Sequence, residues 1–195
     1  MRNIITEEIK YRVHKFLINI AEEHAWRPGL GENSINGGSI YKVTGNNEFE
    51  DFEYVDNWFG GEPYSGMTTI SFKGKVIWVF QYAGRVIPGA DKKQIYEILG
   101  KSLNRYDSTF PIRGPKEIGY DLGNGWGFAT YMNKYGGNIE NFKGIEKIFI
   151  YPKNGDLTPK IRVNSDNYWK YCTETATDNY LKFYTNYFGQ FVNYL

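Results

Sequence analysis

The segment that most restricts the possible folds is 51–87, because strand patterns follow one another there with no helical pattern between them. The expected strands are Asp51–Phe59, Met67–Phe72 and Lys75–Ala83. The dipeptide Lys73-Gly74 between the last two is typical of a tight hairpin. Val76–Phe80 is nearly continuous in apolar residues, which predicts a central strand that is buried on both faces.

Three other segments carry a helical period. Thr6–His24 has one apolar stripe, and Thr6 can accept a capping hydrogen bond. A second helix follows Asp91, which can cap it, and ends near Leu103. The segment 177–193 places five aromatic side chains at helical spacing and predicts an aromatic C-terminal helix; they are Tyr180, Tyr184, Tyr187, Phe188 and Phe191.

Runs of strands separated by helices predict an α+β fold rather than an alternating α/β fold. Further strands are expected at 39–44, 126–132 and 145–151. We therefore expect a mainly antiparallel, curved or barrel-like sheet with an N-terminal, a middle and a C-terminal helix. No linker or repeat divides the chain, so residues 1–195 are expected to form a single domain around a pocket.

Charge and cysteine content exclude several classes of partner. The net charge is +1, which provides no overall field to attract nucleic acid, and we expect no direct nucleic-acid binding. No apolar run is long enough to span a membrane, and a single cysteine favours a reducing compartment, so we expect a cytoplasmic protein without membrane association. One cysteine and two histidines leave no zinc motif, and we expect neither a metal nor a cofactor.

The first candidate site lies where the first strand of the 51–87 run ends. Asp56 and Glu62 are carboxylates flanked by Tyr54 and Trp58. A carboxylate beside aromatic side chains can accept hydrogen bonds from a ligand N–H or act as a base with a raised pKa. The alternative is a strand edge followed by a structured turn.

The second candidate site combines arginines with aromatic residues. Arg85 follows the apolar strand beside Tyr82, and Arg113 is held between two prolines. Two arginines can clamp a phosphate or carboxylate, and Trp126 adds another ring for stacking. The alternative is that each arginine pairs with a nearby acid and stabilises a loop.

Four segments resemble a bacterial domain family of unknown function whose members often follow a repressor-type helix-turn-helix. They read YVDNWFGGEPYSG, VIWVFQYAGRV, FPIRGP and FKGIEKIFIYPKNG, in that order. The resemblance covers roughly residues 14–163 and implies a sensor-like or accessory domain, with no reaction attached to any position. No DNA-binding helices precede it here, and the family's histidine-glycine-glycine segment is replaced by residues 161–166.

Three functions remain open at this point. The first is a module that binds an anionic or aromatic small molecule, such as a nucleotide-derived signal, through the residues of both candidate sites. The second is an interaction or antagonist protein, or a homo-oligomer, that acts through the aromatic C-terminal helix. The third is an enzyme that uses Asp56 or Glu62 as its acid or base. We expect binding rather than catalysis.

Overall fold

The computed structural model describes residues 5–24, 32–33, 38–105, 113–123, 127–152 and 180–192. These residues form two α-helices, one 3-10 turn and nine strands. In chain order the elements are α1 (Glu7–His24), β1 (Glu32–Asn33), β2 (Ser39–Thr44), η1 (Asn47–Phe49), β3 (Phe52–Phe59), β4 (Tyr64–Phe72), β5 (Lys75–Val86), α2 (Lys92–Leu103), β6 (Glu117–Asp121), β7 (Phe128–Asn138), β8 (Asn141–Tyr151) and β9 (Leu181–Phe191).

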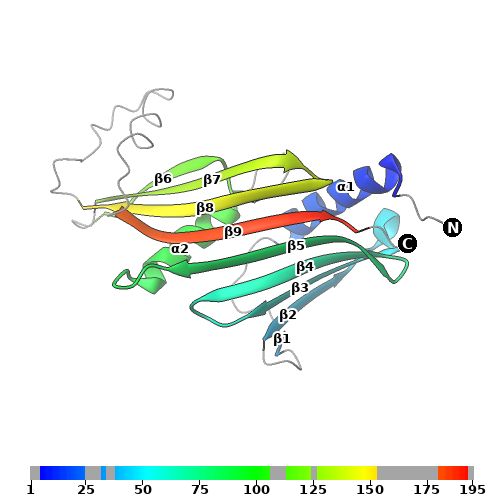
Figure 1. Cartoon of the computed structure of the whole chain (residues 1–195), viewed down its shortest axis with the longest axis horizontal. Coiled ribbons are helices and arrows are strands. Elements are labelled where there is room, and N and C mark those ends of the chain that lie inside the picture. The colour runs from blue at the N-terminus through cyan, green and yellow to red at the C-terminus, as the bar shows by residue number, and fades with distance from the viewer. Residues whose placement is uncertain are drawn as a thin grey trace.

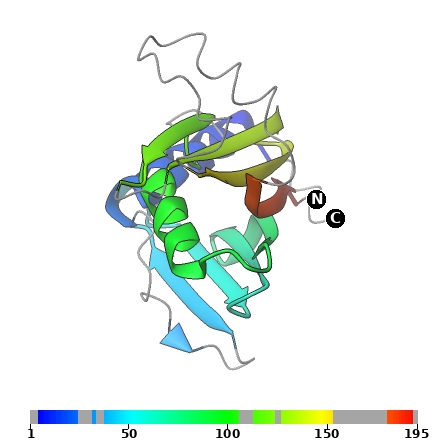
Figure 2. The same cartoon turned by 90° about the vertical axis from the view of Figure 1, so that its left-hand side faces the viewer.

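All nine strands belong to one antiparallel sheet in the order β1-β2-β3-β4-β5-β9-β8-β7-β6. The sheet is curved, and both helices lie on its concave side (Figures 1 and 2). We call the face that carries the helices the inner face and the opposite one the outer face. The sheet is open among the described residues, because β1 and β6 end the order without pairing with each other. The α+β class and the antiparallel curved sheet are therefore confirmed, and a closed barrel is not formed.

Local signals in the sequence correctly placed the first half of the chain. Lys73 and Gly74 have φ values of 51° and 75°, the left-handed pair that a tight hairpin between β4 and β5 requires. The Asp91 side chain accepts hydrogen bonds from the backbone N–H groups of Lys93 and Gln94 at 2.9 and 3.2 Å, so the predicted cap of α2 is confirmed.

The prediction of a C-terminal helix is wrong. Residues 181–191 form strand β9, which is inserted between β5 and β8 in the middle of the sheet. Their burial alternates, with Phe183, Thr185 and Tyr187 on the inner face and more exposed residues between them. Aromatic residues spaced by three and four positions matched a helical period, but their strong preference for strands and the alternation decided the structure.

Two apolar clusters hold the helices against the inner face. Near one end of the strands, α1 packs through Val13, Phe16 and Leu17 against a group that includes Phe52 and Trp78. Near the other end, α2 packs through three buried residues against another group; these are Ile95, Ile98 and Leu99. Among the described residues, no helix has the length and apolar character to cross a membrane.

Glycines on the inner face let tyrosine rings lie flat on the sheet. A Cβ added to Gly66 would lie 2.4 Å from the ring and hydroxyl of Tyr82, which comes from the neighbouring strand β5. A Cβ added to Gly144 would likewise lie 2.3 Å from the ring of Tyr187 on β9. Each tyrosine therefore crosses a neighbouring strand, and its hydroxyl reaches a residue on the strand beyond.

We expect Gly66→Ala to destabilise the protein because the new methyl group must displace the ring of Tyr82. Such overpacking typically lowers the free energy of unfolding by about 1–3 kcal/mol. Gly136→Ala is the matched control, since Gly136 also lies in a strand but has no atom within 4 Å of an added Cβ. Thermal unfolding of both variants tests this, and equal midpoints would contradict the packing that we describe.

Candidate functional site

A band of polar side chains crosses the inner face between the two apolar clusters, and we call it the polar band. Its residues come from β3, β4, β5, β7, β8 and β9 and from the segment before β6; they are Tyr54, Asp56, Thr68, Tyr82, Arg113, Tyr131, Asn133, Glu146, Thr185 and Tyr187. The clusters around α1 and α2 contain mainly apolar residues, so polar groups concentrate between them. A band of this kind is where a polar ligand can be recognised against apolar surroundings.

Asp56 is the carboxylate of the band that is hydrogen-bonded by hydroxyl groups alone. Its Oδ1 accepts from Thr68 at 2.9 Å and from Tyr82 at 3.0 Å, and its Oδ2 lies 3.2 Å from the Tyr82 hydroxyl. Burial raises the pKa of Asp56, although both hydrogen bonds and the charge of Arg113 oppose the shift. Asp56 as a residue is partly exposed to solvent.

Tyr82 reaches Asp56 because Gly66 on the intervening strand has no side chain. Burial and the charge of Asp56 raise the pKa of the Tyr82 hydroxyl. Tyr54, which precedes Asp56 on the same face, also has a raised pKa, caused first by burial and then by Asp56. Both phenols are therefore protonated near neutral pH.

Arg113 is neutralised by Glu146 through a two-pronged ion pair. The Nε and Nη2 atoms of Arg113 donate to the two carboxylate oxygens of Glu146 at 2.9 and 2.7 Å. Tyr131 donates a further hydrogen bond to Glu146 at 2.6 Å, and Glu146 is completely buried. Burial alone would lower the pKa of Arg113, but the charge and hydrogen bonds of Glu146 raise it, so the pair is ionised.

Aromatic rings enclose the guanidinium group as well. Its Cζ atom lies 5.2 Å from the ring centroid of Phe80 and 5.4 Å from that of Tyr187, within the range of cation–π attraction. The Arg113 side chain is nevertheless 18% exposed. Glu146 occupies two of its five N–H donors, and no described residue accepts from the other three.

Hydrogen bonds from two other strands fix the segment that carries Arg113. The Tyr187 hydroxyl donates to Asn133 at 2.5 Å, and the Asn133 amide donates to the carbonyl oxygen of Gly114 at 3.1 Å. Tyr64 and Thr185 share a hydrogen bond beside this network. The position of Arg113 thus depends on strands β7 and β9 as well as on its own neighbours in sequence.

The predicted site residues separate into two groups in space. Tyr54, Asp56 and Tyr82 come together on the inner face with Arg113, and Trp58 lies on the same face of β3. Arg85 does not join them: it is exposed on the outer face, between the inward-facing Gly84 and Val86. The two arginines therefore cannot hold the same anion.

Glu62 stabilises a loop. Its carboxylate accepts from the backbone N–H of Val86 and from the Tyr96 hydroxyl, both at 2.7 Å. This is the alternative expected for a structured turn, and these contacts occupy both carboxylate oxygens. Trp126 lies outside the described residues.

The sequence alone did not single out Glu146, Tyr131 or Tyr187. One signal for Glu146 was present, because an acidic residue occupies a position of β8 that alternates with the buried Phe142 and Ile148. A charged residue at a strand position whose side chain points toward the core predicts a buried partner of opposite charge. Tyr187 had no such signal while its segment was interpreted as a helix.

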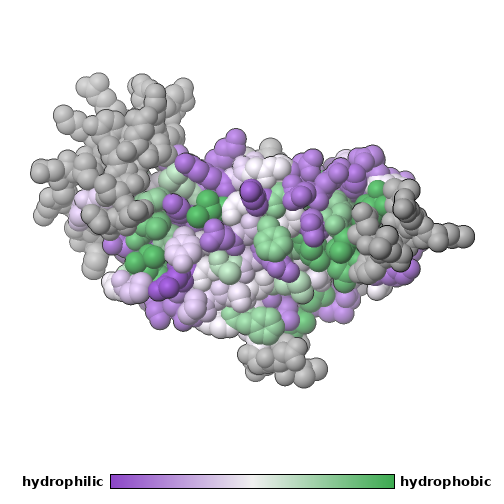
Figure 3. All heavy atoms as spheres, viewed as in Figure 1, coloured by the Kyte–Doolittle hydropathy of each residue, from purple (hydrophilic) through white to green (hydrophobic). Residues whose placement is uncertain are grey.

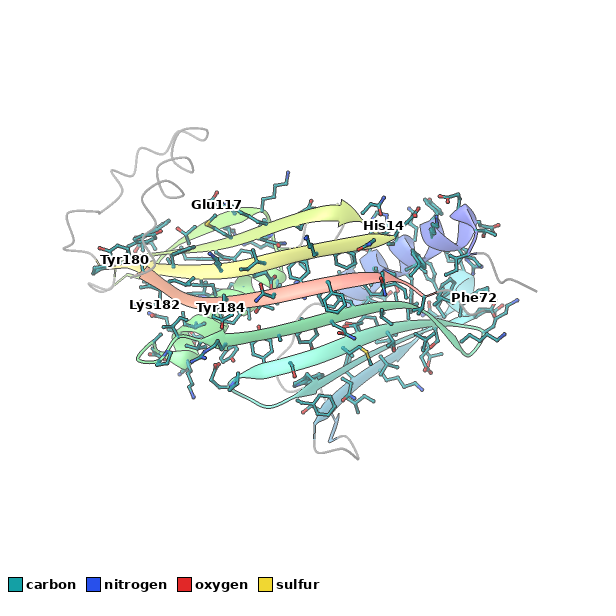
Figure 4. The ribbon with its side chains drawn as sticks, in the orientation of Figure 1. His14, Phe72, Glu117, Tyr180, Lys182 and Tyr184 are labelled. Carbon is teal, nitrogen blue, oxygen red and sulfur yellow. The ribbon has the colours of Figure 1, made fainter. Side chains whose placement is uncertain are left out.

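Glu117 on β6 is a second carboxyl group with a raised pKa. Burial raises its pKa to about 7, while the charge of Lys134 lowers it. Glu117 lies opposite Met132 of β7 in the strand register, and its side chain is on the outer face. It lies toward the same end of the strands as Lys182 and Tyr184 (Figure 4). It is therefore separate from the polar band. Among the described residues, no three His, Cys, Asp or Glu side chains gather in a metal-binding arrangement.

We expect Arg113→Leu to lower the free energy of unfolding by about 3–5 kcal/mol, because it leaves the fully buried carboxylate of Glu146 without a counter-charge. The double variant Arg113→Leu/Glu146→Leu removes both charges and should recover most of that loss. Chemical denaturation of the wild type and both variants gives the comparison. A double variant less stable than Arg113→Leu would contradict this account of the ion pair.

Asp56→Asn should make the protein more stable than the wild type near neutral pH. Because folding raises the pKa of Asp56, its contribution to stability is present below its unfolded pKa of 3.8 and is lost as the pH rises through the folded pKa. Asparagine keeps an oxygen that can accept from Thr68 and Tyr82 but does not ionise. The stability difference between the two proteins, measured by denaturation from pH 4 upwards, should widen as the pH rises.

Comparison with known proteins places the chain in a family without assigning it an activity. No curated protein and no solved structure matches the chain. A family model matches residues 56–158, which are more than half of the chain and include Asp56, Tyr82, Arg113 and Glu146. The chain therefore belongs to the family described as Domain of unknown function (DUF5680).

Proposed function

We propose that the protein is a small-molecule binding module whose ligand is a flat, nitrogen-containing ring that enters the polar band beside Asp56. The observation that carries this proposal is a partly buried carboxylate held by two hydroxyl groups, with tyrosine rings around it. A carboxylate can accept about four hydrogen bonds, so capacity remains for ligand N–H groups. A ring edge with two adjacent N–H donors, as in guanine, matches a carboxylate.

The charge of the band favours a donor-rich ring over a simple anion. Glu146 already neutralises Arg113, and Asp56 adds a negative charge when it is ionised. An anionic ligand would be repelled by the ionised Asp56. It would also lack the second arginine that could bind it, because Arg85 lies on the other face of the sheet. The three remaining N–H groups of Arg113 can still hydrogen-bond to carbonyl oxygens of such a ring.

This ligand class fits the sensor-like or accessory role that the family resemblance implies. A cytoplasmic location would suit both the role and the single cysteine of the sequence. The enzyme alternative uses the same carboxylate as its acid or base, and the hydroxyls of Thr68 and Tyr82, which donate to Asp56, would be its candidate nucleophiles. The interaction alternative loses its C-terminal helix, and of the aromatic residues assigned to it only Phe188 is strongly exposed.

We expect one of the common nucleobases or nucleosides, with guanosine the first choice, to raise the thermal unfolding midpoint of the full chain. Asp56→Asn should weaken binding by about tenfold or more, since hydrogen bonds to charged groups contribute about 1.5–3 kcal/mol. Affinity should also fall as the pH is lowered through the pKa of Asp56, because the protonated carboxyl accepts fewer hydrogen bonds. Isothermal titration calorimetry measures both effects.

Glu53→Gln is the matched control for this experiment. Glu53 lies on the same strand as Asp56 but pairs with Lys42 in an exposed ion pair, so the change from carboxylate to amide there should leave affinity unchanged. A panel of bases and nucleosides without any binding, or binding that is equal in the wild type and Asp56→Asn, would exclude the proposed ligand class.

A further inference from the structure

The outer face of the sheet carries a shallow groove on the opposite side of the strands from the polar band, although Tyr82 and Tyr187 of the band are among the residues that line it. It encloses about 1040 Å³ and crosses the strands from β3 to β7. Two neighbouring rows of outward side chains line it. One row runs through Met67, Gln81, Phe188 and Lys143, and the other through Phe59, Ser65, Ala83, Asn186, Ile145 and Lys134.

Small side chains in the second row produce the depression. Ser65 and Ala83 are cross-strand partners, and they lie beside the much larger Met67 and Phe188 of the first row. Phe59, Met67 and Phe188 are 39%, 40% and 49% exposed, which is unusual for large apolar residues. Apolar side chains interrupt the hydrophilic surface across the middle of this face (Figure 3).

Among the described residues, the two lysines at the β7–β8 side of the groove, Lys134 and Lys143, form no direct ion pair, although the charge of Lys134 lowers the pKa of Glu117 on the same face. The adjacent row of the outer face adds Arg85 and Lys147, which flank Tyr184. A groove with an apolar floor and positive charge at one end and along one edge is complementary to a ligand that is apolar on one side and acidic at the matching end.

We propose that this groove binds an acidic amphipathic helix of a partner protein. The four central strands of the groove, β4, β5, β9 and β8, are hydrogen-bonded on both sides, so recognition across them must use side chains. At the end of the groove, β7 pairs with β6 only up to Met132, so an added strand could pair with that one edge but could not cover the groove. The strand spacings from β3 to β7 give the groove a length of about 24 Å, which corresponds to about 16 helical residues. Met67 and the aromatic side chains are of the types enriched at protein interfaces.

Two other occupants fit the groove less well. A second copy of this chain, joined face to face at this groove, would offer no acid to Lys134 and Lys143, because no described residue that lines the groove is acidic. A single-stranded nucleic acid would use the cations, but the exposed rings of Phe59 and Phe188 come from β3 and β9 with two strands between them, so they form no row of successive stacking platforms. Both remain outcomes that the experiment distinguishes.

The test is a selection of random peptides of about 16 residues, displayed on phage, against the full chain. We expect enriched sequences that combine apolar residues at helical spacing with Asp or Glu toward one end and along one flank of the apolar stripe. Selected peptides, labelled with a fluorophore, should lose affinity by about tenfold or more with Phe188→Ala and with Lys134→Glu/Lys143→Glu. Fluorescence anisotropy measures this loss.

Lys92→Glu/Lys93→Glu provides the control for charge, because both lysines are exposed in the first turn of α2, away from the outer face. This variant should bind the peptides as the wild type does. Basic or patternless selected sequences, or equal losses in both charge variants, would overturn the proposal. So would tighter binding of an oligothymidylate of the same length, or a concentration-dependent dimer that Phe188→Ala abolishes.

Discussion

Strand β9 is the element on which the arrangement of the whole sheet depends. It pairs with β5 on one side and β8 on the other, so without it the sheet would separate into β1–β5 and β6–β8. The polar band also needs it, since Tyr187 from β9 fixes Asn133 and packs on Arg113. The outer groove uses the opposite side of the same strand through Asn186 and Phe188.

Sequence reasoning succeeded where a structure is determined locally. The hairpin at Lys73-Gly74 and the cap at Asp91 depend on residues within a few positions, and both are confirmed. It failed for β9, because pairing with β5 and β8 is a contact between distant segments and because the aromatic spacing also fitted a helix. The sequence also did not show on which face of the sheet Arg85 lies. The preceding strand is apolar at almost every position, so no alternation distinguishes its inner from its outer side chains.

The two faces of the sheet differ in how their charges are compensated. On the inner face, Arg113 and Glu146 neutralise each other, and hydroxyl groups support Asp56. On the outer face, Lys134 and Lys143 form no direct ion pair among the described residues, and Lys134 acts on Glu117 only through its charge, although the net charge of the chain is only +1. Net charge therefore hides the asymmetry, because the strand register decides which charges gather on one side. Asp56 and Arg113, two of the candidate residues from the sequence, depend on partners from other strands for their properties.

The flat tyrosines make pairs of positions dependent on each other during evolution. Tyr82 can cross β4 only above a glycine, and Gly66 leaves an uncovered backbone unless a ring lies over it. Gly144 and Tyr187 are related in the same way on the other side of the sheet. Relatives of this chain should therefore keep each glycine together with its tyrosine or replace both. In a relative that has lost the tyrosine, the glycine position no longer needs to stay without a side chain, and the two positions can then be substituted independently.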